Sequence, residues 1–188
     1  MDEAAKQEES VIIAGFGGQG VILAGKLLAH AAMRADKEVT LIPAYGAEVR
    51  GGTSNCTVII SEHPIASPMV SAPTSLVIMN KASQAKFAHC LRPGGILIYN
   101  SSLIDAAPDL PETDTVVPIP ADELAIELGN QKVANMIMLG AYARLCRILD
   151  LTAVMEALPH VLAERYHNTL DTNRAALKKG ADFVICHH

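Results

Sequence analysis

The sequence predicts an α/β fold, with a mixed, mostly parallel sheet between two layers of helices. Short apolar runs that are typical of buried strands alternate along the chain with segments of helical period. The clearest example is the apolar run 11–14, which is followed by a glycine-rich turn at 15–20 and a helical pattern over 21–33. The connection between the second and third predicted strands is too short for a crossover helix, so we expect one antiparallel pair of strands.

Each further element is predicted from its apolar period and from the glycine and proline residues that bound it. The strands after the first are predicted at 38–42, 55–61, 75–79, 96–100 and 114–118. The helices after the first are predicted at 82–90, 121–129, 132–149, 152–157 and 160–180, with a loop at 43–53. Because no repeat or linker interrupts this series, we expect residues 1–188 to form a single domain with a polar N-terminal tail at 1–9.

The glycine-rich turn is the first candidate binding site. Gly15, Gly17 and Gly20 fit the pattern G-x-G-x-x-G, a Rossmann-like turn that opens a helix in dinucleotide-binding domains. Such domains place an acid at the end of the second strand, but here strand 38–42 runs into Pro43-Ala44-Tyr45-Gly46. A free-standing NAD- or FAD-binding module therefore remains an alternative. A further alternative is a turn that binds no ligand and whose glycines only permit tight packing.

A set of motifs spread over the chain is more specific than the glycine turn alone. It consists of Gly17-Gly18-Gln19-Gly20, then Tyr45-Gly46, Glu48 and Arg50-Gly51-Gly52, and then the strand 58–61. In this order the motifs resemble the gamma subunits of 2-oxoacid:ferredoxin oxidoreductases, most of all those of the 2-oxoglutarate and branched-chain 2-oxoacid enzymes. The resemblance covers about residues 10–183, and its later motifs are Lys132–Met136, Gly140, Asn173–Ala175 and Gly180.

The resemblance implies a role within a complex. Such complexes decarboxylate a 2-oxoacid, for example pyruvate or, as we expect here, 2-oxoglutarate; they transfer the acyl group to coenzyme A and pass electrons to ferredoxin. The resemblance implies that the alpha and beta subunits hold thiamine diphosphate with Mg. Partner subunits, including a ferredoxin-like delta subunit or ferredoxin itself, would hold the iron–sulfur clusters. The gamma subunit is then an accessory subunit that completes the assembly and the coenzyme A site, and it contributes no catalytic residue.

Two candidate sites follow from the motifs. We expect the loop 17–20 to bind an anion, with coenzyme A as the candidate, because N–H groups at a helix start favour negative charge. The second loop combines aromatic and charged side chains with glycines, which is typical of an interface. We expect that interface to be formed by Tyr45, Glu48, Arg50, Gly51 and Gly52. A solvated turn with a weak surface ion pair is the alternative for this loop.

Composition argues against several other classes of protein. Hydrophobic residues make up 50% of the chain and charged residues 19%, so extra apolar surface is expected in subunit interfaces or in a well-packed interior. The net charge of −5 argues against a nucleic-acid partner. No apolar run approaches the roughly 20 residues that span a bilayer. The polar, acidic start of the chain is unlike a signal peptide, so we expect a cytoplasmic protein.

Sequence motifs for metal or cofactor binding are missing as well. The cysteines form no C-x-x-C pair, and the seven histidines show no ligand spacing. The Gly-Asp-Gly motif with a following Asn, typical of thiamine-binding subunits, is not present in the sequence. We therefore expect the isolated chain to bind no cofactor and to be inactive. We also expect it to fold alone and to self-associate through the surface meant for its partners.

Overall fold

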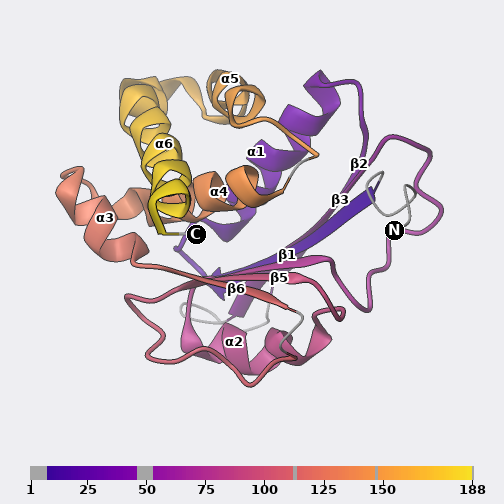
Figure 1. Ribbon diagram of the computed structural model, residues 1–188. Helices are drawn as coiled ribbons and strands as arrows, with labels where there is room; N and C mark the ends of the chain where they lie inside the picture. Colours follow the sequence, from indigo (N-terminus) through magenta and orange to yellow (C-terminus); the bar gives the residue numbers. More distant parts are fainter. Residues whose placement is uncertain (1–7, 46–52, 112–113, 147, 188) are drawn as a thin grey trace.

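The computed structural model describes residues 8–45, 53–111, 114–146 and 148–187, which form a mixed sheet with helices on both faces (Figure 1). Within these ranges the strands are β1 (Glu8–Phe16), β2 (Glu38–Tyr45), β3 (Thr53–Ser61), β4 (Ser75–Ile78), β5 (Ile96–Asn100) and β6 (Thr115–Ile119). Their order across the sheet is β2-β3-β1-β4-β5-β6. β3 is antiparallel to both of its neighbours, whereas β1, β4, β5 and β6 are parallel. The predicted mixed, mostly parallel sheet is confirmed, with two antiparallel pairs in place of one.

The central strand β1 is covered on both faces, which explains its continuous apolar run. Successive side chains of a strand point to opposite faces, and all four residues of the run 11–14 are buried. β1 begins at Glu8, which pairs with Ser61 of β3, so residues 8 and 9 belong to the strand and not to a tail. β2 continues through Pro43 to Tyr45, although the sequence predicts a loop from 43, because β3 pairs with β2 over its whole length. Pro43 is compatible with this pairing because β2 is an edge strand.

The helices cover the two faces of the sheet unequally. They are α1 (Val21–Arg34), α2 (Lys81–Phe87), α3 (Ala121–Glu127), α4 (Ala134–Leu145), α5 (Leu151–Val161) and α6 (Leu170–His187), with 3-10 turns at 88–90, 131–133 and 164–169. Figure 1 shows α2 on one face and the other helices on the opposite face. None of the helices in the described ranges is both long and apolar enough to cross a membrane.

The last third of the chain departs most from the prediction. The expected helix 160–180 is wrong at its start, because α5 extends to Val161 and α6 begins only at Leu170. Leu162 has an extended backbone, with φ −77° and ψ 128°, and so ends α5. Apolar residues on both sides of this break continue one helical pattern, and Pro159 lies inside the last turn of α5. Periodicity alone therefore does not reveal the break.

Helix α4 lies at the centre of the thicker layer, and every residue from Ala134 to Ala143 is buried. It crosses α6 at two glycines. A Cβ atom built on Gly140 would lie 1.9 Å from the carbonyl oxygen of Leu177, and one on Gly180 would lie 1.9 Å from that of Ile137. Any side chain at either position would therefore force the two backbones apart. This close crossing gives a physical reason for both of the later glycines in the sequence motifs.

Candidate functional site

The glycine turn lies at the carboxyl ends of β1 and β4, where the chain leaves the two strands toward opposite faces of the sheet. After β1 the chain enters α1 on one face of the sheet, and after β4 it enters α2 on the other face (Figure 1). Neighbouring parallel strands whose helices leave to opposite faces create a crevice at that edge, which is the usual ligand position in open α/β sheets. The candidate site therefore lies at a topological switch point.

The turn itself has an unusual backbone at two glycines. Gly18 has φ 100° and Gly20 has φ 73°, a left-handed conformation that side chains other than glycine rarely adopt. Gly20 is the N-cap of α1, which has neither a side-chain cap nor an acidic residue in its first turn. The amide groups at this helix start therefore retain their capacity to bind an anion.

Packing explains some of these glycines and not others. A Cβ on Gly15 would lie 2.9 Å from the Cβ of Met79, and one on Gly20 would lie 2.3 Å from Nδ2 of Asn135. A Cβ on Gly18, in contrast, would meet no atom within 4 Å. Tight packing thus accounts for Gly15 and Gly20, while Gly18 faces open space and is required only by its backbone conformation.

The side chain of Gln19 is held by an amide network. Its Oε1 accepts hydrogen bonds from the backbone N–H of Phe16 at 2.7 Å and from Nδ2 of Asn80 at 2.8 Å. The orientation of Asn80 is itself fixed, because its Oδ1 accepts a hydrogen bond from the backbone N–H of Ser83 at 2.9 Å. The oxygen of Gln19 is therefore occupied by two donors, and its NH2 group is the part left to bind a ligand.

A pocket of about 190 Å³, here called the carboxyl-edge pocket, opens beside Gln19. It is lined by Gly18, Gln19, Met79, Asp122, Gln131, Lys132, Ala134 and Asn135. Asn135 is 5% exposed and donates a hydrogen bond from Nδ2 to the carbonyl oxygen of Gly20 at 3.1 Å, which ties α4 to the start of α1. Asp122 accepts a hydrogen bond from the buried Asn100 at 2.6 Å. The ammonium group of Lys132 has no ion-pair partner within the described ranges.

The structure brings together residues that the sequence places far apart. Gly18 and Gln19 of the predicted loop line one pocket together with Lys132 and Asn135, which belong to the later motifs. Asn80 and Asp122 are not among the predicted site residues. Asn80 follows a predicted strand and precedes a predicted helix. Its place at the carboxyl edge of the sheet can therefore be inferred from the sequence. Nothing in the local pattern around Asp122 identifies it.

The second predicted site is only partly visible. Tyr45 ends β2, where its backbone pairs with that of Ser54. Glu48, Arg50, Gly51 and Gly52 lie outside the described residues. The interface role of this loop therefore remains a prediction.

The cysteines do not form a reactive or metal-binding centre in the described part of the chain. Burial raises the pKa of the Cys56 thiol and of the Cys146 thiol to about 12 in each case. These thiols are therefore protonated and unreactive near neutral pH. No group of three or more His, Cys, Asp or Glu side chains in the described ranges is arranged to hold a metal ion.

Comparison with known proteins identifies the family. The sequence model of the family described as "Pyruvate ferredoxin/flavodoxin oxidoreductase" matches residues 10–183. The chain belongs to this family. Among solved structures, it resembles the gamma subunit of a keto/oxoacid ferredoxin oxidoreductase from Geobacter sulfurreducens PCA, with a TM-score of 0.82 and 28% identity over 95% of this chain and 97% of that one. The predicted resemblance to a gamma subunit is thereby confirmed.

The relatives differ in length. The chain is 35% identical to the 2-oxoglutarate synthase subunit KorC of Methanocaldococcus jannaschii over 93% of both chains. It is 38% identical to the ketoisovalerate oxidoreductase subunit VorA of Methanothermobacter marburgensis over 98% of this chain, but spans only 38% of VorA. A 2-oxoglutarate:ferredoxin oxidoreductase from Magnetococcus marinus gives a TM-score of 0.87 at 26% identity, over 97% of this chain and 32% of that one. The same domain thus corresponds to whole subunits in some relatives and to about a third of a longer chain in others.

Proposed function

We propose that the chain is the gamma subunit of a complex that oxidatively decarboxylates a 2-oxoacid, forms an acyl-coenzyme A and passes the electrons to ferredoxin. The observation that carries this proposal is the end-to-end match with KorC, a subunit of similar extent. The role proposed for this chain is accessory. We assign thiamine diphosphate, Mg and the iron–sulfur clusters to alpha, beta and ferredoxin-like partners, because the sequence of this chain has neither a C-x-x-C pair nor the Gly-Asp-Gly motif.

The carboxyl-edge pocket supports a part in binding coenzyme A, whose phosphate groups are anionic. Two donors belong to its lining, namely the NH2 group of Gln19 and the ammonium group of Lys132. The uncapped start of α1 follows Gln19 directly in the chain. Asp122 is the single acid of the lining, and Asn100 already donates to it. The set therefore favours a negatively charged group.

The size of the pocket limits what it would hold. Pockets that enclose a whole small molecule measure roughly 300–1,000 Å³, whereas this one measures about 190 Å³. The chain would therefore bind one anionic group of coenzyme A, and partner subunits would bind the rest.

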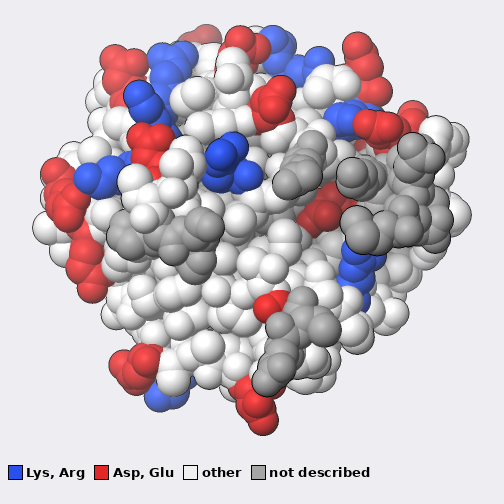
Figure 2. All heavy atoms as spheres, viewed as in Figure 1, with Lys and Arg blue, Asp and Glu red and all other residues white. Residues whose placement is uncertain are grey.

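A partner surface around this pocket is also part of the proposal. Large apolar side chains are exposed on segments at or after the carboxyl ends of three strands. They are Phe16 at the end of β1 (37% exposed), Leu103 after β5 (47%) and Ile126 on α3, which follows β6 (61%). Exposed apolar side chains that gather in one region are typical of an interaction surface. Figure 2 shows the side of the molecule on which β6 lies, where charged side chains gather toward the rim and the lower middle is largely uncharged. We assign Tyr45, Glu48, Arg50, Gly51 and Gly52 to the same partner surface.

The substrate is proposed to be 2-oxoglutarate, on the strength of the end-to-end match with KorC. The higher identity to VorA supports 2-oxoisovalerate as a second candidate. Turnover of the purified complex with 2-oxoglutarate, 2-oxoisovalerate and pyruvate in parallel distinguishes these substrates.

The variant Gln19→Glu tests the anion site. Glutamate keeps an oxygen for the N–H of Phe16 and for Asn80, but replaces the NH2 group by a negatively charged oxygen. Because a hydrogen bond to a charged group contributes about 1.5–3 kcal/mol, we expect the KM of the complex for coenzyme A to rise about tenfold or more. The KM for the 2-oxoacid should stay unchanged. Gly18→Val is less informative, since φ 100° would strain any side chain there.

Lys178→Gln serves as the matched control, because it removes an exposed charge on α6 away from the pocket. It should leave both KM values unchanged. An unaltered KM for coenzyme A in a correctly assembled Gln19→Glu complex would refute the anion site.

Co-purification of an Arg50→Ala chain with its partners tests the proposed interface. If the loop forms this interface, the variant should assemble with its partners less tightly. The isolated chain should show no 2-oxoacid-dependent reduction of an artificial acceptor.

A further inference from the structure

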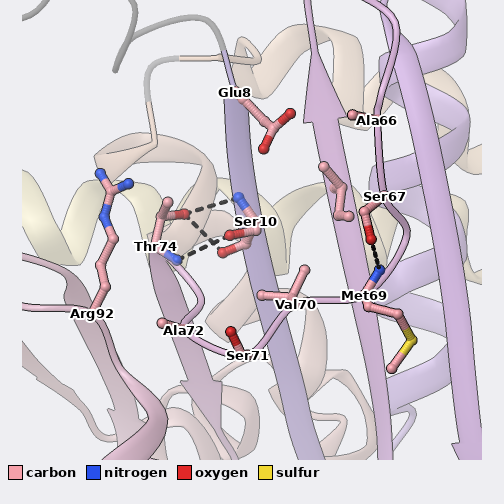
Figure 3. A pocket seen from close by; sticks show the side chains of 11 residues that line it. Glu8, Ser10, Ala66, Ser67, Met69, Val70, Ser71, Ala72, Thr74 and Arg92 are labelled. Carbon is pink, nitrogen blue, oxygen red and sulfur yellow. Dashed lines mark hydrogen bonds between the residues drawn. The ribbon is translucent and has the colours of Figure 1, made fainter.

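A second and larger pocket lies at the opposite edge of the sheet, and the proposed function does not use it. This amino-edge pocket has a volume of about 470 Å³ and lies between the sheet and the connection that leads from β3 to β4 (Figure 3). Its lining includes Glu8, Ser10, Ile59, Val70, Thr74 and Arg92. Its volume falls within the roughly 300–1,000 Å³ that is typical of small-molecule sites.

The floor of the pocket is rigid. The N–H of Ser10 donates to Oγ1 of Thr74 at 2.9 Å, the N–H of Thr74 donates to Oγ of Ser10 at 3.1 Å, and Oγ1 of Thr74 donates to the carbonyl oxygen of Ser10 at 2.7 Å. These three bonds join the beginnings of β1 and β4 and satisfy the polar groups of both residues (Figure 3). The floor therefore keeps its shape without a ligand, which lowers the cost of binding one.

Two opposite charges border this floor. In Figure 3, Glu8 and Arg92 lie on opposite sides of Thr74. Neither the Glu8 carboxylate nor the Arg92 guanidinium has a hydrogen-bond or ion-pair partner within the described part of the chain. Both groups are therefore available to a ligand that carries the complementary charges.

The rest of the lining consists of apolar side chains and two serines, Ser67 and Ser71. Ile59 of β3 lies on the same face of the sheet as Ser10, with which it pairs. Val70 belongs to the connection that leads from β3 to β4. A ligand whose two charged groups pair with Glu8 and Arg92 could thus place an attached aliphatic group against these side chains, which reward the burial of apolar surface.

We propose that the amino-edge pocket binds an apolar α-amino acid. The carboxylate pairs with Arg92, whose planar guanidinium forms paired hydrogen bonds with carboxylates. The ammonium group pairs with Glu8, and the aliphatic side chain packs against Ile59 and Val70. All residues assigned to the site belong to this chain. The length of β1 separates the site from the carboxyl-edge pocket.

Titration calorimetry of the full chain with L-leucine and L-valine tests this proposal. We expect saturable binding of at least one of them. The analogue 4-methyl-2-oxopentanoate, which lacks the ammonium group, and isopentylamine, which lacks the carboxylate, should each bind at least about tenfold more weakly, because each loses one charged contact. Equal binding of leucine and 4-methyl-2-oxopentanoate would overturn the assignment of Glu8.

Variants at the two exposed charges complete the test. Arg92→Gln and Glu8→Gln should each weaken leucine binding about tenfold or more, while Lys178→Gln should leave it unchanged. Circular dichroism verifies that each variant is folded. The proposal is wrong if neither amino acid shows binding at a concentration of about 10 mM, ten times a dissociation constant of 1 mM. It is also wrong if the folded Arg92→Gln variant binds leucine as tightly as the unmodified chain does.

Discussion

The two faces of the sheet differ in how deeply they are covered. On one face, α1, α4, α5 and α6 join the sheet in a large apolar cluster that contains eight of the ten buried residues of α4. On the other face, the described residues form a cluster of only eight buried side chains beneath α2 and the neighbouring loops. The amino-edge pocket opens on this thinner face, because Ser10 and Ile59 point there. Stability is therefore concentrated on one face, whereas the other has room for a pocket.

The largest expected effect of a single substitution is at the crossing of α4 and α6 in the thick layer. Gly180→Ala should lower the free energy of unfolding by about 4 kcal/mol or more, or prevent folding, because the new Cβ would meet the backbone of Ile137. Urea denaturation monitored by circular dichroism measures this loss. Ala175→Leu, which enlarges an exposed residue of the same helix, should change it by less than about 0.5 kcal/mol. A loss below about 1 kcal/mol for Gly180→Ala would show that the layer is looser than the structure implies.

A direct comparison of the two faces comes from two buried leucines. Leu28 of α1 belongs to the large cluster and Leu76 of β4 to the small one, and both are at most 1% exposed. Each change to alanine should cost about 2–5 kcal/mol, with Leu28→Ala near the upper end. The loops and the two-turn helix over Leu76 can close part of the cavity, whereas the packed helices around Leu28 cannot. Equal losses by urea denaturation would contradict the difference between the faces.

Raising the pH should lower the free energy of unfolding by a smaller amount, because it ionises the buried thiols of the thick layer. Cys56 and Cys146 have a pKa of about 12 in the folded chain, against an ordinary value of 9.0. The folded chain therefore favours the protonated thiols. The stability that this preference contributes is complete below pH 9 and is lost as the pH rises from 9 toward 12. At pH 10 the loss should be on the order of 1 kcal/mol for each thiol.

Denaturation curves at pH 8 and pH 10 measure this decline. A Cys56→Ala and Cys146→Ala double variant provides the control, since it lacks both thiols and should decline less steeply. If both chains decline equally, other groups such as Tyr142, whose pKa burial also raises, govern the alkaline limit.

Much of this architecture was accessible from the sequence because strands and helices follow local periodicity. β5 was predicted at its observed bounds, and α1 to within a residue. The strand order was not accessible, since pairing of β1 with β3 and β4 is decided by contacts between distant segments. The break between α5 and α6 was hidden because apolar residues continue across it. Local patterns thus predict where each strand and helix lies in the sequence better than they predict which elements lie side by side in the fold.

The candidate site shows the same division. The loop 17–20 was found from its glycines and the resemblance, and Lys132 and Asn135 belong to the motifs that support the family. The amide network through Asn80 was not predicted, because it depends on the side-by-side arrangement of β1 and β4. The amino-edge pocket was not predicted either, since its lining comes from four separate segments of the chain.

The position of β3 between β2 and β1 also affects how the chain assembles during synthesis. β1 emerges first, but its two neighbours are β3 at 53–61 and β4 at 75–78. Until residue 61 has left the ribosome, the apolar strand 11–14 has no native strand to pair with. Unpaired strand edges are prone to join other chains. The nascent chain is therefore most exposed to aggregation while β2 and β3 are still being made, and pairing of β3 with β1 ends that interval.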